Sequence, residues 1–159
     1  MVVETKFARF DSITLDSGVA LAPVEVAYET YGALNAARSN AILILHAFSG
    51  DAHAAFENAE GQEGWWDNVI GPGKAFDTDR YFVICANVLG GCRGTTGPAT
   101  VNGATGRPYA MTFPLITIGD MVRLQKMLKL ARLAPDLVEA IASGLQPGSV
   151  RASNQDRVW

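Results

Sequence analysis

The chain has 159 residues, of which 48% are hydrophobic, and this is enough apolar material to bury the core of one compact domain. Its net charge of -3 excludes a basic surface over the whole chain, so nucleic acid and anionic membranes are not expected partners. No window approaches the roughly 18 apolar residues of a membrane span, and the N-terminus lacks a secretory pattern, so we expect a cytoplasmic protein.

Three apolar runs predict the strands of a sheet. Residues 24–31 alternate with a period of two, which is typical of a strand with one polar face. The runs at 41–45 and 81–86 are apolar without alternation, as expected of strands that are covered on both faces in a parallel sheet. The sequence therefore predicts an α/β fold with a mostly parallel sheet.

A long segment separates the second and third predicted strands. Residues 50–76 are rich in glycine around Trp65 and Trp66, which predicts an ordered loop with at most short helices. Ordered loops of this length are usually functional. We interpret the two tryptophans as anchors of the loop rather than as a surface on which a cofactor stacks.

The C-terminal part of the chain predicts helices. Thr117 followed by Asp120 is an acidic variant of the capping box, and it predicts a helix from about 118 to 132. Four apolar side chains fall on one face of this helix and are expected to pack on the sheet: Met121, Leu124, Leu128 and Ala131. A second short helix is predicted near 135–143, followed by a frayed end.

Polar residues that follow the second predicted strand are candidates for chemistry. His46 stands at the carboxyl end of a strand, where α/β sheets place ligands, and it is either functional or a structural hydrogen-bonding residue. His46, Asp51 and His53 match no standard metal-site spacing, so no metal is expected. Cys85 and Cys92 form no C-x-x-C pair, and we expect two reduced thiols.

The glycine-rich stretch at 87–98 follows the third predicted strand. Neither phosphate-binding glycine motif can be placed on it, and it does not lead directly into a helix. Backbone turns with positive φ account for its glycines.

The sequence lacks the nucleophile of an acyl-transfer enzyme of the serine type. A nucleophile elbow reads G-x-S-x-G, because its strained turn leaves no room for side chains beside the serine. None of the seven serines has this flanking, and Ser49 has Ala47 and Asp51 at the two glycine positions. The chain is therefore not expected to form an acyl-serine by itself.

Taken together, the motifs between residues 23 and 128 resemble homoserine O-acetyltransferase, a family of the α/β-hydrolase superfamily. The matching blocks are residues 26–32, 40–43, 46–53, 64–67, 70–73, 77–85, 87–94, 96–98, 105–109, 113–114, 117–118 and 120–122. The resemblance implies an N-terminal part of an α/β-hydrolase fold that lacks the nucleophile strand.

The resemblance also implies an activity, in which acetyl is transferred from acetyl-CoA to L-homoserine during methionine biosynthesis. The family forms an acyl-serine with the help of a His-Asp pair, and backbone amides hold the oxyanion. The position of Phe48 matches one of these amide donors, and Arg93 is a candidate substrate-binding residue. Acetyl-CoA is implied as a co-substrate, and no bound cofactor is expected.

The resemblance ends near residue 128, before the serine, aspartate and histidine of the family. We therefore expect a partial α/β-hydrolase domain at 1–131 and a tail of different origin at 132–159. The chain is expected to be truncated before the catalytic serine and inactive alone. The alternatives are a noncatalytic fragment or interaction module, or a remnant of a related succinyltransferase or esterase.

The missing nucleophile strand has a consequence for the sheet. In the order that the resemblance implies, this strand lies beside residues 41–45, which would otherwise form an open edge. The segment contains neither a charged residue nor a proline, the devices that usually block edge pairing. We therefore predict self-association through this strand.

Overall fold

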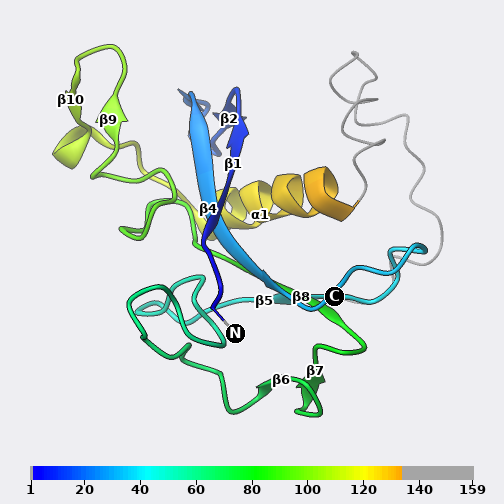
Figure 1. The fold of residues 1–159 in the computed structure, drawn as a ribbon. Coiled ribbons are helices and arrows are strands. Elements are labelled where there is room, and N and C mark those ends of the chain that lie inside the picture. The colour runs from blue at the N-terminus through cyan, green and yellow to red at the C-terminus, as the bar shows by residue number, and fades with distance from the viewer. Residues whose placement is uncertain (1, 134–159) are drawn as a thin grey trace.

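A computed structural model of the chain describes residues 2–133 and contains a four-stranded sheet in the order β1-β4-β8-β5 (Figure 1). The strands are β1 (Lys6–Phe10), β4 (Val24–Tyr31), β5 (Ala41–Ile44) and β8 (Phe82–Ala86). All three strands predicted from the sequence are present, within one residue of their predicted bounds. The predicted helix near 135–143 and the frayed end lie outside the described residues.

The sheet is mixed rather than mostly parallel. β5 pairs with β8 in parallel, whereas β1 with β4 and β4 with β8 pair antiparallel. β1 and β4 are joined by a hairpin of β2 (Ile13–Thr14) and β3 (Ala20–Leu21), with no crossover helix. Parallel neighbours in a sheet need such a crossover connection. Since β1 and β4 are joined by a hairpin instead, they pair antiparallel.

Two further pairs of short strands complete the described structure. β6 (Ile70–Gly71) pairs in parallel with β7 (Phe76–Asp77), inside the predicted long loop. β9 (Val101–Asn102) pairs antiparallel with β10 (Arg107–Pro108), and a short 3₁₀ turn, η1 (Ala110–Thr112), follows. No helix occurs between residues 50 and 76, as the sequence predicts.

The helix α1 (Ile118–Leu133) covers one face of the sheet. The amide of Thr117 donates to Asp120 Oδ2 at 2.9 Å, and the amide of Asp120 donates to Thr117 Oγ1 at 3.1 Å, so the predicted capping box is confirmed. Asp120 also accepts the amide of Asp16 at 2.8 Å, and Arg123 bridges Asp16 and Asp120 at 2.6 Å each. The start of the helix is thus fixed to the turn after β2.

The sheet separates two apolar cores. On one face, Leu124 and Leu128 of α1 pack with residues of β1, β4 and β8, among them Val26 and Ile84. On the opposite face, residues 52–77 supply the cover instead of a helix, and their apolar side chains pack on Val83 and other sheet residues. Among the described residues, no helix is long and apolar enough to cross a membrane.

The strand β4 is buried on both faces, which differs from the prediction of one polar face. Its central residues are buried, including Glu29, which is only 1% exposed. The cover over this second face comes from the loop after β5, far away in the sequence, so local periodicity could not reveal it.

We predict that Leu124→Ala lowers the free energy of unfolding by about 2 to 5 kcal/mol, because it leaves a cavity between α1 and the sheet. Val122→Ala on the exposed side of the same helix is the matched control and should change stability by less than about 0.5 kcal/mol. Urea unfolding followed by circular dichroism measures both. Equal losses for the two variants would contradict the packing of α1 described here.

Candidate functional site

The turn at residues 46–50 directly follows β5 and carries Phe48 at its tip. The amide of Gly50 donates to the carbonyl of Ala47 at 2.8 Å and closes the turn. The side chain of Phe48 is fully exposed, and its backbone N–H has no hydrogen-bond partner among the described residues. Ser49 is exposed beside it. The turn thus presents a backbone donor at the carboxyl end of a sheet strand.

His46 fixes this turn to the loop that follows β8. Its Nε2 accepts the amide of Val88 at 3.3 Å, and therefore the ring proton lies on Nδ1, which donates to the carbonyl of Ala47 at 2.8 Å. Of the two interpretations left open by the sequence, the structure supports the structural hydrogen-bonding residue.

The loop after β8 is tightly folded on itself. Gly90 has a φ of 80°, and a Cβ atom at Gly97 would lie 2.3 Å from the carbonyl oxygen of Gly91. Positive φ explains Gly90, as predicted, whereas close backbone approach explains Gly97. The side chain of Asn87 accepts the amide of Ala52 at 2.6 Å and donates to the carbonyl of Arg93, so the loop is joined to the segment after the turn.

The structure brings Phe48 and Arg93 to one hollow of about 190 Å³. Its other lining includes His46, Ser49 and Cys92. The guanidinium of Arg93 is 69% exposed and lies 3.7 Å from the carboxylate of Asp51, a loose ion pair that leaves its donors accessible. The two candidate residues from the sequence therefore lie on the same small surface.

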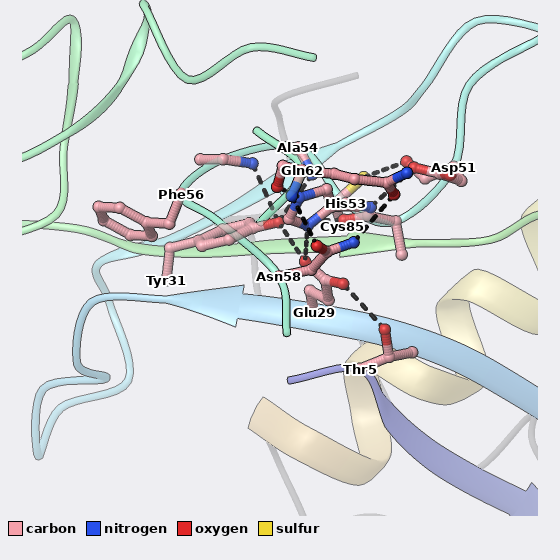
Figure 2. A network of polar contacts seen from close by, with 12 residues as sticks. Thr5, Glu29, Tyr31, Asp51, His53, Ala54, Phe56, Asn58, Gln62 and Cys85 are labelled. Carbon is pink, nitrogen blue, oxygen red and sulfur yellow. Dashed lines mark hydrogen bonds and ion pairs between the residues drawn. The ribbon is translucent and has the colours of Figure 1, made fainter. Parts of the chain in front are cut away.

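A buried polar network lies next to this surface, and Figure 2 shows it. The carboxylate of Glu29 accepts the hydroxyls of Thr5 at 2.9 Å and Tyr31 at 2.8 Å, and it lies 3.0 Å from Nδ1 of His53. The hydroxyl of Tyr31 also accepts the amides of Ala54 at 2.8 Å and residue 55 at 3.2 Å. The network joins β4 to the segment after the turn.

Burial and the neighbouring charge of Glu29 raise the pKa of Tyr31, so its hydroxyl stays protonated. Sequence reasoning missed this network. The only signal was an acidic residue at an alternating position of an apolar strand, which also fits a solvent-exposed face.

The two thiols are both free and differ in their surroundings. Cys85 is buried on β8, and burial raises its pKa to about 12, so it is a protonated core residue. Cys92 is exposed at the small hollow.

His46, Asp51 and His53 do not converge. Among residues 2–133 no group of three potential metal-ligating side chains is close enough to hold an ion. The rings of both histidines contact acceptors or donors of the protein instead.

The tryptophan pair supports the loop beneath the site. Trp65 Nε1 donates to the carbonyl of Asp51 at 3.0 Å, and the rings of Trp65 and Trp66 lie 5.1 Å apart. Trp66 also contacts Phe76 at 6.0 Å. Both tryptophans are 38% exposed, so they are anchors that remain partly accessible.

Comparisons with known proteins agree with this geometry. No protein-family model matches the chain. The homoserine O-acetyltransferase of Leptospira biflexa is 57% identical over 128 residues, and that of Carboxydothermus hydrogenoformans is 59% identical over 129 residues. The chain is a partial homologue of homoserine O-acetyltransferase. In both relatives the match covers 80% of this chain but only 34% of the relative, so the chain spans about a third of their length.

Solved structures give the same result for the fold. The homoserine O-acetyltransferase from Bacillus anthracis superposes with a TM-score of 0.75 and 43% identity, over 81% of this chain and 36% of that one. Esterase E22 superposes with a TM-score of 0.76 and 42% identity, over 82% of this chain and 38% of that one. The described residues therefore adopt part of an α/β-hydrolase fold.

We predict that Tyr31→Phe destabilises the chain by about 1 to 3 kcal/mol, because the buried carboxylate of Glu29 loses a donor and the amides of Ala54 and Ala55 lose an acceptor. Tyr81→Phe, at a half-buried position, is the matched control. Thermal or urea unfolding measures the difference. A Tyr31→Phe variant as stable as Tyr81→Phe would show that the network contributes little.

Proposed function

We propose that this chain forms the oxyanion and acceptor side of a homoserine O-acetyltransferase site. The observation that supports this most directly is the unpartnered amide of Phe48, held on a fixed turn beside the accessible guanidinium of Arg93. An N–H group aimed at the place where negative charge develops stabilises the transition state of acyl transfer. The assignment rests on the resemblance of this turn to that of the family.

The proposed reaction has two halves. A serine attacks the thioester of acetyl-CoA, the thioester carbonyl oxygen becomes an oxyanion that accepts from the amide of Phe48, and CoA leaves as its thiol. The hydroxyl of L-homoserine then attacks the acyl-serine, and the same amide holds the second oxyanion. Arg93 is proposed to bind the carboxylate of L-homoserine, since a guanidinium forms bidentate hydrogen bonds with carboxylates. The product would serve methionine biosynthesis in the cytoplasm.

These 159 residues contain no glycine-framed serine, and we propose that they do not complete the reaction alone. Within this proposal, His46 has a positioning role. Its two hydrogen bonds fix the turn that carries Phe48 against the loop that carries Arg93.

An esterase is the second candidate, and the similarity to esterase E22 favours it. A carboxylic ester would replace acetyl-CoA as the donor and an alcohol would leave, the role of Phe48 would be unchanged, and water would replace the amino-acid hydroxyl as acceptor. A succinyl donor or a noncatalytic role would likewise leave the described fold unchanged. The distinction depends on the acceptor, so a test must measure transfer and hydrolysis together.

We predict that residues 1–128, grafted onto the remainder of the Leptospira biflexa relative, support acetyl transfer to L-homoserine, while the 159-residue chain alone does not. In the graft, Phe48→Pro removes the amide donor and should lower kcat roughly 100- to 1,000-fold, whereas Phe48→Ala keeps the donor and should have a much smaller effect. CoA release and O-acetylhomoserine are measured separately.

Full activity of a folded Phe48→Pro graft would refute the oxyanion assignment. CoA release without O-acetylhomoserine would show that water replaces L-homoserine as the acceptor, and release of acetate from a simple acetyl ester would favour the esterase. Turnover by the chain alone would contradict the need for an external nucleophile.

We further propose that the chain self-associates through β5, the last strand in the sheet order. The carbonyl of Asn40 accepts the amide of Phe82, and since backbone groups alternate along a strand, those of residues 41, 43 and 45 face away from β8. Leu43 pairs with Ile84 and so lies on the α1 face of the sheet, but Leu43 and Leu45 are 38% and 62% exposed and neither belongs to the core that α1 covers.

A second copy fits this edge in one favoured register. With Leu43 opposite Leu43 in an antiparallel pair, residue 41 of each copy lies opposite residue 45 of the other, and all outward backbone groups find partners. The paired segment contains no charged side chain, so two copies meet without like-charge repulsion.

We predict that Leu43→Lys shifts the chain from dimer to monomer, because it places two like charges opposite each other. Val101→Lys, at an exposed apolar position on β9, is the matched control. Light scattering after size-exclusion chromatography measures the mass. In a Cys92→Ser background, Leu43→Cys should form a disulfide-linked dimer and Leu45→Cys should not. A wild-type monomer would contradict the pairing.

A further inference from the structure

The imidazole of His53 lies between two hydrogen-bond acceptors. Its Nδ1 is 3.0 Å from Oε2 of Glu29, and its Nε2 is 2.9 Å from the carbonyl oxygen of Gln62 (Figure 2). A carbonyl oxygen and an ionised carboxylate only accept, whereas a neutral imidazole has a single N–H. If His53 were neutral, one of its two ring nitrogens would present a lone pair to the lone pair of an acceptor oxygen. An imidazolium, with a proton on each nitrogen, satisfies both.

Hydrogen-bond donors surround the carboxyl group of Glu29. The Tyr31 hydroxyl accepts the amides of Ala54 and Ala55, and it lies 2.8 Å from Oε2 of Glu29 and 3.1 Å from the carbonyl oxygen of Ala52. The hydroxyl of Thr5 donates to Oε1 at 2.9 Å. With His53 as a third donor, a carboxylate with no proton of its own is fully hydrogen-bonded, although its side chain is only 2% exposed.

Other charged groups surround the ring, and the carboxylate of Asp51 favours the cation. Asp51, two residues away in the same segment, faces the ring, and the guanidinium of Arg93 lies 3.7 Å beyond it. The thiol of Cys85 on β8 is protonated and neutral. Two more acidic residues, Glu4 and Glu60, line the pocket that contains the ring. Burial by itself lowers the pKa of His53, but the hydrogen bonds to Gln62 and Glu29 outweigh it, so the pKa is raised.

The contact with Gln62 connects β4 to a small closed turn. The amide of Asn58 donates to the carbonyl of Gln62 at 3.0 Å, and the amide of Gln62 donates to Oδ1 of Asn58 at 2.9 Å, so residues 58–62 form one unit. This turn forms one wall of a pocket of about 600 Å³, and Glu29, His53 and Arg93 lie on its other walls. Of the described hydrogen bonds, the one to Nε2 of His53 connects this turn to the Glu29 network.

We propose that His53 is a positively charged latch, which holds the turn at 58–62 against β4 while both ring nitrogens are protonated and releases it when one proton is lost. Glu29 supplies the opposing charge, and Gln62 supplies the contact that opens. This device is independent of acyl transfer, because it uses none of the groups assigned to the oxyanion.

The direction of the pH dependence follows from the raised pKa. A histidine whose pKa is higher in the folded chain than in the unfolded chain contributes its full stabilisation below about pH 6.5, the unfolded value. That contribution is lost as the pH rises through the folded value. The latch is therefore closed in acid, and it opens as the pH rises through the His53 midpoint.

Nitrogen-15 NMR of the histidine rings in the full chain tests this directly. We expect a titration midpoint above that of a free imidazole, with both ring nitrogens of His53 protonated below it. The ring of His46, whose Nε2 accepts the amide of Val88, is the internal control. A His53 midpoint at or below that of a free imidazole would overturn the proposal, and the wild-type titration requires no variant.

Amide hydrogen exchange, corrected for the intrinsic rate at each pH, tests the opening. The amide of Trp65, which donates to the carbonyl of His53 at 3.3 Å, should lose protection above the His53 midpoint. Every pH unit by which the midpoint exceeds that of free imidazole corresponds to about tenfold protection. The amide of Asn87, which donates to the carbonyl of Ala27 at 2.9 Å, is the control and should keep its protection.

Glu29→Gln keeps the size of the side chain and removes its charge. It should lower the His53 midpoint and shift the loss of Trp65 protection to lower pH by the same amount. An unchanged midpoint in this variant, or Trp65 protection that is independent of the His53 titration, would contradict a latch based on the Glu29 charge.

Discussion

The carboxylate of Glu29 in the middle of β4 is the constraint on which the second face of the sheet depends. A buried carboxylate must be surrounded by donors, because leaving it unpaired would cost several kcal/mol. Its donors come from the N-terminal segment, from β4 itself and from the segment after the turn at 46–50. Satisfying one charge therefore fixes three separate stretches of chain in relation to one another.

The candidate site is a consequence of this arrangement. No helix covers the second face in the described part of the chain, so irregular segments must supply both its apolar cover and its polar partners. The backbone of residues 51–55 is bound on one side by Tyr31 and on the other by Asn87. The turn with Phe48 and the loop with Arg93 are then held by groups that belong to the core rather than to the surface.

The sequence allowed the regular elements to be predicted because their signals are local. The alternation at 24–31 predicted β4 to the residue, and the Thr117 and Asp120 pair located the start of α1. The burial of Glu29 was not predicted, since its cover lies some two dozen residues further along the chain. The antiparallel pairing of β4 with β8 was likewise not predicted, because it joins two segments that are distant in sequence and local patterns do not specify strand partners.

The candidate site could also be predicted only in part from the sequence. Phe48 and Arg93 were found through resemblance to a family, and the structure places both at one hollow. The roles of Phe48 and Arg93, and the division of the chain near residue 131, remain predictions. His46 was correctly recognised as a candidate, but its hydrogen bond to the amide of Val88 depends on two loops meeting in space. His53 was considered only as a metal ligand, because the acceptor on each side of its ring is distant in sequence or belongs to the backbone.

The link between Asp16 and the start of α1 bears on how the chain acquires its structure during synthesis. Asp16 and Asp120 are 104 residues apart, so the first hairpin leaves the ribosome long before the helix that completes its core. Until then β1 and β4 expose the apolar face that Leu124 and Leu128 later cover. Contacts of such long sequence separation form late and slowly. The nascent chain thus exposes this apolar face until the residues of α1 have been synthesised.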